Sequence, residues 1–230
     1  MHPELFKVGF LVVHTYGVLI AVGIFISVLW ARNLAKKTGF PSTNKVFDLL
    51  FVVVVSGFIG GRIFYVLQEW DHYREHFLEI FAIWEGGLVY YGGVLGAIMG
   101  HFLYVRYLGL SYPAAADFVI PFIALTHAFG RVGCFFSGCC YGKNGIPVQL
   151  FEAAFNFALF GFLLRAYGRR RFPGEIFASY LLWYPAGRFF FEFLRGDQIP
   201  WFFSLTLQQI LSLVFILLGV ALYGICRHRA

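Results

Sequence analysis

Residues 126–143, THAFGRVGCFFSGCCYGK, place an arginine, four glycines and three cysteines at the end of a long apolar segment. Apolar helices are stable in a bilayer, but an isolated cationic side chain there costs at least about 2.5–3.5 kcal/mol. Arg131 therefore needs a carboxylate or phosphate partner. Other arginines stand beside a glycine or near a glutamate: Arg62, Arg188 and Arg195. This pattern predicts an integral membrane protein with a cationic site for lipid phosphate.

The composition excludes a soluble globular domain. Of the 230 residues, 60% are hydrophobic and only 13% are charged, which lies outside the range of soluble proteins. The net charge is +6, but the basic residues lie between apolar runs rather than along one face, so we expect no nucleic-acid partner. The first ten residues lack a basic region, and the apolar run that begins at Val8 is too long for a cleavable signal peptide.

Segments of about 20 apolar residues mark the expected membrane spans. We expect an all-α, polytopic membrane protein with seven transmembrane helices, in a single domain over residues 1–230. No linker and no internal repeat divides the chain, which argues against a transporter built from inverted halves. The expected spans are Val8–Ala31, Val46–Leu67, Gly87–Tyr107, Ala114–Phe136, Val148–Tyr167, Glu175–Leu194 and Leu205–Cys226.

Basic residues in the connections predict the orientation of the chain. Alternate connections carry Lys and Arg, whereas the connections between them carry few, and residues 69–85 are acidic. Because basic loops stay in the cytoplasm, we expect an outside N-terminus and a cytoplasmic C-terminus, as an odd number of spans requires. The basic residues are Arg32, Lys36, Lys37, Lys45, Arg106, Arg165, Arg169, Arg170, Arg171, Arg227 and Arg229.

Polar residues inside these spans are the candidate site. Arg62 follows two glycines in the second span and is either ion-paired or a phosphate ligand. Glu152 shares one helical face with Gln149 and Asn156, which suits either structural pairing or proton transfer. Arg188, Glu192 and Arg195 follow the i, i+4, i+7 pattern of one face. Glu192 can pair with one arginine and leave the other to bind an anion, although such ladders are also purely structural.

Three of the four cysteines fall in one short stretch, Cys134, Cys139 and Cys140, while Cys226 lies near the C-terminus. Their spacing does not suggest a zinc site. Adjacent cysteines rarely form a disulfide with each other, because their Cα atoms lie only about 3.8 Å apart. The sequence leaves open whether these cysteines fill space in a helix end or act as reactive thiols.

Six ordered motifs across most of the chain resemble the prolipoprotein diacylglyceryl transferases of bacterial inner membranes. They are HTYG, GGRIFYVL, GGLVYYGGVLG, HAFGRVGCFFSGCCYGK, PVQLFE and GRFFFEFLRGD. The resemblance implies transfer of a diacylglyceryl group from phosphatidylglycerol to the lipobox cysteine of a prolipoprotein. A thioether forms and glycerol-1-phosphate leaves, from a site facing the periplasmic side of the inner membrane. Membrane lipid surrounds the enzyme, and we expect no metal or organic cofactor.

The resemblance also implies site residues. Arg131 matches the family's signature arginine and would grip the phosphate, and Arg188, Glu192 and Arg195 match its second arginine cluster. The other matches are Glu152, Arg62 and the first-span Tyr16.

Two departures from the family pattern affect the chemistry. The family has His-Gly-Gly where this chain has Tyr91, Gly92 and Gly93, and it has Asn and Glu where this chain has Cys134 and Cys139. The family's histidine base is therefore absent. His127 lies one helical turn before Arg131, and we expect it in the same pocket.

An unperturbed tyrosine, with a pKa near 10, is a poor base. We therefore hypothesise that Tyr91 hydrogen-bonds the substrate and that Glu152 takes the proton. Three alternatives remain: a related enzyme with another acceptor, a non-enzymatic lipid-binding or transport protein, and a membrane thiol-redox protein.

Overall fold

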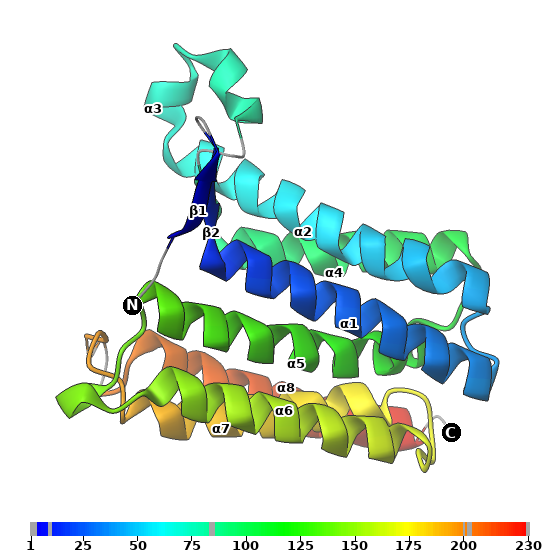
Figure 1. The fold of residues 1–230 in the computed structure, drawn as a ribbon. Helices are drawn as coiled ribbons and strands as arrows, with labels where there is room; N and C mark the ends of the chain where they lie inside the picture. Colours follow the sequence, from blue (N-terminus) through cyan, green and yellow to red (C-terminus); the bar gives the residue numbers. More distant parts are fainter. Residues whose placement is uncertain (1–3, 9–10, 83–85, 200, 202–203, 229–230) are drawn as a thin grey trace. The chain divides into compact units, whose positions relative to one another are not determined.

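Helices form nearly all of the regular structure in the computed structural model, which describes residues 4–8, 11–82, 86–199, 201 and 204–228 (Figure 1). Each of the seven predicted segments contains a long helix. Short helical turns occur between them, among them α3 (Trp70–Tyr73) and a 3₁₀ turn at Phe77–Phe81. The long helices are α1 (Thr15–Thr38), α2 (Val46–Gln68), α4 (Tyr90–Tyr107), α5 (Tyr112–Ser137), α6 (Val148–Tyr167), α7 (Glu175–Glu192) and α8 (Leu207–His228).

Five of these helices, α1, α2, α5, α6 and α8, are long and apolar enough to cross a membrane. The chain is therefore a multi-pass membrane protein. Helices α4 and α7 have 18 residues each and are not among those five. Helix α7 carries Glu175, Arg188 and Glu192 within its length, and these charges lower its hydropathy. Seven spans would require α4 and α7 to cross the membrane as well, so the number seven stays a prediction.

The predicted start of the first helix at Val8 is wrong. Two antiparallel strands, β1 (Glu4–Val8) and β2 (Leu11–His14), precede α1, which begins only at Thr15. Apolar length alone cannot separate a strand from a helix. The β-branched pair Val12 and Val13 favours the extended conformation. Among the described residues, this hairpin contains both of the β-strands, and the other regular elements are helices.

The chain divides into two compact units, one of Met1–Leu34 with Ala116–Ala230 and one of Ala35–Ala115. The first unit contains most of α1 with α5, α6, α7 and α8, and the second contains α2, α3 and α4. The expectation of a single domain over residues 1–230 stays a prediction.

Glycines form the contact between α2 and α4 in the second unit. A Cβ atom on Gly92 would lie 2.6 Å from the carbonyl oxygen of Gly60, and one on Gly60 would lie 2.7 Å from the Cα atom of Gly96. No side chain fits at these distances, so the two backbones approach as closely as helices can. Small residues at i and i+4 create such contacts in membranes, where van der Waals packing drives helix association.

Glycines also bring α1 against α5 in the first unit. A Cβ atom on Gly133 would lie 2.9 Å from the ring of Tyr16, and one on Gly23 would lie 2.9 Å from Phe129. The hydroxyl of Ser27 contacts that of Thr126 at 3.0 Å. The glycine that follows Arg131 by two residues therefore has a packing role, and it fixes α5 beside the start of α1.

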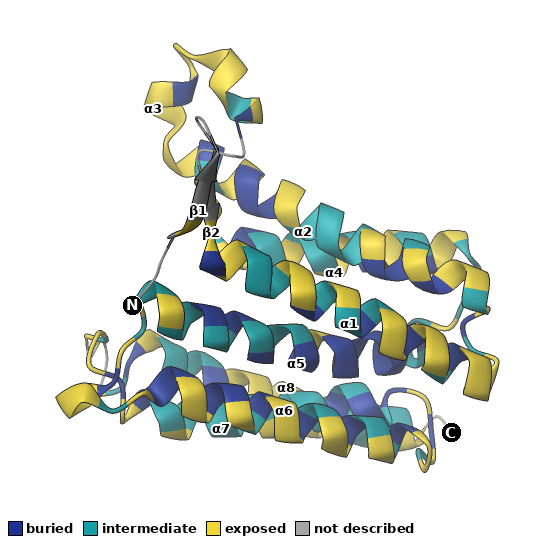
Figure 2. Cartoon of the chain, viewed as in Figure 1, coloured by how far each residue is buried: buried dark blue, intermediate teal, exposed yellow. Residues whose placement is uncertain are grey.

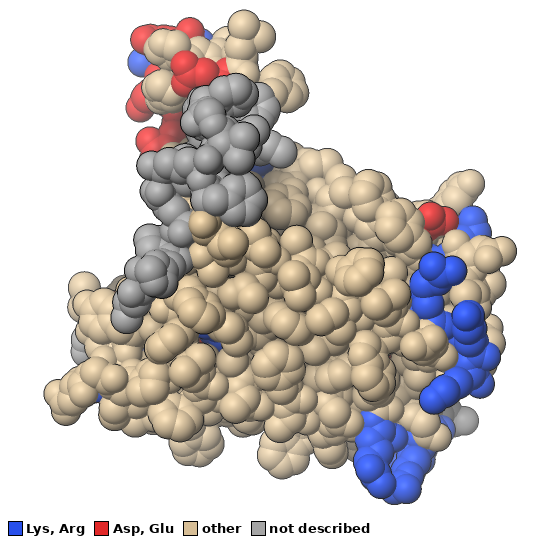
Figure 3. Space-filling view, viewed as in Figure 1, with Lys and Arg blue, Asp and Glu red and all other residues tan. Residues whose placement is uncertain are grey.

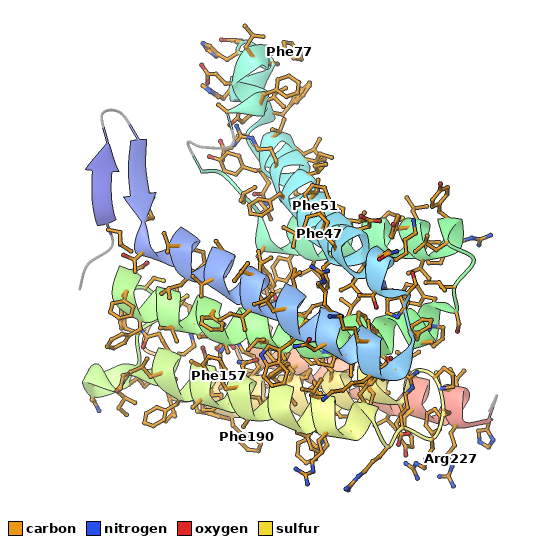
Figure 4. All side chains as sticks on the ribbon, turned by 45° about the vertical axis from the view of Figure 1, so that its right-hand side comes forward. Phe47, Phe51, Phe77, Phe157, Phe190 and Arg227 are labelled. Carbon is orange, nitrogen blue, oxygen red and sulfur yellow. The ribbon has the colours of Figure 1, made fainter. Side chains whose placement is uncertain are left out.

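Many of the exposed residues along the helices (Figure 2) are large and apolar. Phe190 is 68% exposed, and Phe47 and Phe51 stack on each other while more than half exposed (Figure 4). Soluble proteins rarely expose large contiguous apolar surfaces. This surface fits contact with lipid.

On the face that Figure 3 shows, most of the visible charged side chains lie in clusters at the edges of the molecule. In the second unit, the acidic residues Asp71, Glu75 and Glu79 lie around α3, and Lys45 precedes α2 at its opposite end. In the first unit, Arg169, Arg170 and Arg171 follow the C-terminus of α6, and Arg227 lies in the last turn of α8.

Candidate active site

Glu152 on α6 joins two arginines from neighbouring helices. Its Oε2 atom lies 2.9 Å from Nε of Arg131 on α5, and its Oε1 atom accepts a hydrogen bond of 3.0 Å from Nη1 of Arg188 on α7. The side chains of the two arginines are only 13% and 10% exposed, and that of Glu152 is 3% exposed. A buried arginine requires a partner of opposite charge, and one carboxylate here serves two. This geometry favours the pairing role of Glu152 over the proton-acceptor role.

The same network continues along the C-terminal end of α7. Nη1 of Arg188 also lies 2.7 Å from Oε2 of Glu192, and the hydroxyl of Thr206 donates a 2.7 Å hydrogen bond to Oε1 of Glu192. Arg195 lies 3.9 Å from Glu192 and donates two hydrogen bonds to Asp197, of 2.9 and 2.6 Å. The predicted contact between Arg188 and Glu192 is confirmed, but the prediction that Arg195 continues the same helical face is not met. Arg195 lies just beyond the last helical residue, Glu192.

A small cavity of about 10 Å³, close to the volume that one water molecule needs, lies between α5, α6 and α7. Its walls include the two arginines and Glu152. Nδ2 of Asn156 donates a 2.8 Å hydrogen bond to the carbonyl oxygen of Glu152, while Oδ1 of Asn156 is buried without a hydrogen-bond partner among the described residues. The remaining lining residues are Phe155, Tyr184 and Phe191. The ring of His127 lies against that of Tyr184, with 5.1 Å between centroids, so His127 is next to a wall of this cavity.

The chain turns sharply after α5 in a Schellman motif. The backbone N–H of Cys139 donates to the carbonyl of Cys134, and that of Gly138 donates to the carbonyl of Phe135, each at 3.2 Å. Gly138 has the left-handed φ of 72° that this motif requires. The turn folds the chain back over the helix end and returns Cys139 to the neighbourhood of Cys134.

Backbone hydrogen bonds tie this turn to the end of α7. The N–H of Lys143 donates to the carbonyl of Leu194 at 2.8 Å, and the N–H of Gly196 donates to the carbonyl of Tyr141 at 3.0 Å. A Cβ atom on the intervening Gly142 would lie 2.4 Å from the carbonyl oxygen of Ile146 and 3.1 Å from that of Leu194. Glycine is therefore required here for close approach, and the bridge places Arg195 beside the cysteine turn.

Three thiols converge at this turn. The Sγ atoms of Cys134, Cys139 and Cys140 all lie within 4.8 Å of one another. A hydrogen bond from Cys134 and the positive charges of Arg195 and Arg131 lower the pKa of Cys140 to about 5, although partial burial opposes this shift. The cysteines thus lie within the electrostatic field of the arginine network.

A wide pocket of about 560 Å³ opens beside the thiols. This volume is within the range of small-molecule sites. Cys134 and Cys139 form one wall, and the start of α1 forms another with the predicted site residue Tyr16. The other lining residues are His14, Gly17 and Ser137.

Arg62, in the second unit, binds backbone carbonyls rather than acidic side chains. It donates hydrogen bonds to the carbonyl oxygens of Glu79 at 2.6 Å, Ile80 at 2.9 Å and Gly86 at 2.8 Å. Its guanidinium also lies 5.3 Å from the centre of the Tyr73 ring. These contacts hold the connection between α2 and α4 against the end of α2, so the geometry favours a structural role.

Tyr91, Gly92 and Gly93 lie in the first turn of α4 in the second unit. Tyr91 is 41% exposed, and its ring packs edge-on to that of Tyr90. Gly92 is buried in the contact with α2 described above. The roles of these three residues in the site stay predictions.

Sequence reasoning overlooked three members of the site: Asp197, Thr206 and Tyr184. Asp197 stands two residues after Arg195, and a carboxylate so close to a buried arginine was a usable signal. Thr206 and Tyr184 carry no pattern that separates them from other polar residues in apolar sequence.

The sequence of the chain is similar to those of known proteins over nearly its whole length. A model of the family described as "Prolipoprotein diacylglyceryl transferase" matches residues 3–225. The chain belongs to this family. A phosphatidylglycerol–prolipoprotein diacylglyceryl transferase of Clostridium tetani is 31% identical over 249 residues, covering 100% of this chain and 99% of the relative. One from Geobacillus kaustophilus is 33% identical over 248 residues, with 96% and 91% covered.

The family resemblance marks several residues of this network from the sequence alone. The residues that the resemblance marked on α5, α6 and α7 meet in one chain of ion pairs in the first unit, together with Tyr16 at the neighbouring pocket. The other marked residues, Arg62 and Tyr91 to Gly93, belong to the second unit.

Proposed function

We propose that this chain transfers the diacylglyceryl group of phosphatidylglycerol to the lipobox cysteine of prolipoproteins, forming a thioether and releasing glycerol-1-phosphate. The observation that carries the proposal is the buried network in which Glu152 joins Arg131 to Arg188. Buried arginines such as Arg131 on α5 and Arg188 on α7 are rare in membrane proteins and mark functional sites, and the family's reaction expels an anionic phosphate.

Arg131 is the proposed phosphate ligand. Its ion pair engages Nε, so we assign the two Nη nitrogens to the lipid phosphate. Arginine suits this role because its planar fork matches phosphate oxygens in pairs. Positive charge aimed at the leaving oxygen stabilises the negative charge that develops there.

Glu152, Glu192 and Asp197 are the proposed positioning residues. They fix Arg131, Arg188 and Arg195 before the lipid arrives, so that little side-chain entropy is lost on binding. Both oxygens of Glu152 face guanidiniums, which makes it the centre of this arrangement rather than the acceptor of the thiol proton.

The 560 Å³ pocket is the proposed place where lipid and thiol meet. It shares the C-terminal end of α5 with Arg131, and Tyr16 on its wall is 45% exposed. We propose that Tyr16 hydrogen-bonds the headgroup. In the second unit, Arg62 shapes the connection between α2 and α4 through its carbonyl contacts, and Gly92 and Gly93 allow α4 to pack against α2. Tyr91 is proposed to contact the substrate.

The proposed setting is the bacterial inner membrane, with seven spans, an outside N-terminus and the site facing the periplasm. The positive residues after α6 and at the end of α8 support this orientation, because basic loops remain cytoplasmic. The cysteine turn, which lies at the opposite end of α5 from its connection to α4, then faces outward.

The function is tested with purified protein in detergent, phosphatidylglycerol and a lipobox peptide that carries a free cysteine. Mass spectrometry detects the diacylglyceryl adduct. We expect an adduct with the unaltered protein and its loss with Arg131→Ala. Arg165→Ala is the matched control, because Arg165 is exposed and lies outside the network.

An adduct that persists in Arg131→Ala would contradict the proposed role of the network. Absence of the adduct from the folded, unaltered protein, with phosphatidylglycerol still bound, would assign the chain to lipid binding without transfer.

A further inference from the structure

The thiol cluster has the composition of a metal site. Three sulfurs within 4.8 Å of one another are close to the arrangement around one ion, because Zn–S bonds of about 2.3 Å place neighbouring sulfurs about 3.8–4.0 Å apart. Inward movements of a few tenths of an ångström close this difference. Thiolates select Zn²⁺ and Cu⁺ over the harder cations.

The backbone explains why these three thiols meet. Cys134 lies on the last turn of α5, and the Schellman turn at Gly138 reverses the chain so that the next two residues face that turn. Cys140 has a left-handed φ of 58°. Nε2 of Gln149 on α6 donates a 2.8 Å hydrogen bond to the carbonyl of Cys139 and fixes the turn from the other side. The thiols are thus held by backbone geometry before any ion binds.

The electrostatic surroundings also suit a bound ion. Three thiolates and one divalent ion carry a net charge of −1. Arg131 and Arg195 interact electrostatically with Cys140, and their positive charges favour a site that remains negative when it is loaded.

One coordination position would remain open. Three protein ligands and a free fourth position characterise catalytic zinc sites, whereas structural sites are closed by four. Cys134 and Cys139 line the 560 Å³ pocket, so a fourth ligand from the pocket can reach an ion held between them.

We propose that Cys134, Cys139 and Cys140 bind a thiophilic metal ion, Zn²⁺, whose fourth ligand is the thiol of the substrate cysteine. A metal ion deprotonates a coordinated thiol, and this replaces the histidine base that the chain lacks. The thiol proton passes to water in the pocket. The sulfur lone pair then forms the C–S bond to the glycerol carbon, while the C–O bond breaks and its electron pair leaves with glycerol-1-phosphate. The ion keeps its oxidation state.

This inference rests on the proposed function for its substrate, but the metal site is tested without turnover. The protein is purified anaerobically, and its zinc content is measured by inductively coupled plasma mass spectrometry. We expect about one zinc per chain, falling to about a tenth or less in Cys139→Ser, since loss of a thiolate ligand weakens binding strongly. Cys226→Ser is the matched control and keeps the zinc, because Cys226 lies outside the cluster.

The open position is tested by replacing zinc with Co²⁺, whose thiolate complexes absorb in the near ultraviolet. Without phosphatidylglycerol, a lipobox peptide with a free cysteine should strengthen this sulfur-to-cobalt band, and the same peptide with serine should leave it unchanged.

Metal-free protein with four free thiols would overturn the metal site. Two missing thiols would overturn it as well and identify a disulfide. If cobalt binds but its absorption spectrum does not change when the cysteine peptide is added, the role of the substrate thiol is overturned. An adduct formed equally well by metal-free Cys139→Ser would refute this inference while leaving the proposed function standing. A cobalt response without any adduct would refute the function and retain the site.

Discussion

Replacing Arg188 by Met should destabilise the protein strongly, because one guanidinium nitrogen neutralises two buried carboxylates. Nη1 lies 3.0 Å from Glu152 and 2.7 Å from Glu192, and the arginine side chain is only 10% exposed. Removal of one partner of a buried pair costs about 3–5 kcal/mol. At about 2–4 °C per kcal/mol for a chain of this size, Tm should fall by roughly 6–20 °C.

The assay is thermal unfolding in detergent, followed by intrinsic fluorescence, with Arg165→Met as the exposed control. The double variant Arg188→Met/Glu192→Gln should recover part of the loss, because it removes the charge of Glu192, whose nearest remaining cation is Arg195 at 3.9 Å, whereas Glu152 keeps Arg131 at 2.9 Å. A Tm within about 2 °C of the unaltered protein would show that the ion pairs contribute no stability. A double variant less stable than the single one would refute the pairing of Arg188 with Glu192.

Three further predictions test other contacts. Gly92→Val should separate α2 from α4 and prevent folded protein from accumulating in membranes, whereas Gly109→Val in a loop should reduce its yield less; equal yields would contradict the close helix contact. Asp117→Ala should cost about 2–6 kcal/mol in unfolding measurements, because the Asp117 carboxylate accepts hydrogen bonds from two N–H groups at the start of α7, at 2.8 and 2.9 Å. Partial burial raises the pKa of Asp197, but hydrogen bonds from Arg195 outweigh this and leave it below 3.8. The stability that the Arg195–Asp197 pair contributes is therefore fully present above about pH 4, the pKa of an unperturbed aspartate, and is lost as the pH falls through the lowered pKa. Asp197→Asn should remove this acid-dependent part of an unfolding titration, and an unchanged titration would contradict it.

Much of the helical framework follows from the sequence because membrane helices satisfy their own backbone groups. The segment Val148–Tyr167 agrees with α6 at both ends. The start of α1 was misplaced, since the apolar run at Val8 gives no signal of where strand becomes helix.

The site was predictable to the extent that its charges lie on helix faces. The regular spacing of Arg188 and Glu192 placed them together, and burial demanded a partner for Arg131. The sequence could not show that Arg62 binds backbone carbonyls, because every residue has a carbonyl group and no residue type marks the ones that are bound.

The thiol cluster could not be predicted from spacing. The interval between Cys134 and Cys139 matches no common zinc pattern, and the three thiols meet only through the Schellman turn. We expected no metal cofactor because electrostatics and positioning suffice for this displacement, and the proposed zinc site departs from that expectation.

The network of Arg131, Arg188 and Arg195 with Glu152, Glu192 and Asp197 contains three positive and three negative charges. Its formal charges sum to zero, so its field decays quickly outside the helices and attracts no anions from a distance. Lipids consequently reach it by lateral diffusion, and recognition begins only on contact. Added salt, which screens long-range attraction, should then leave the capture of phosphatidylglycerol nearly unchanged.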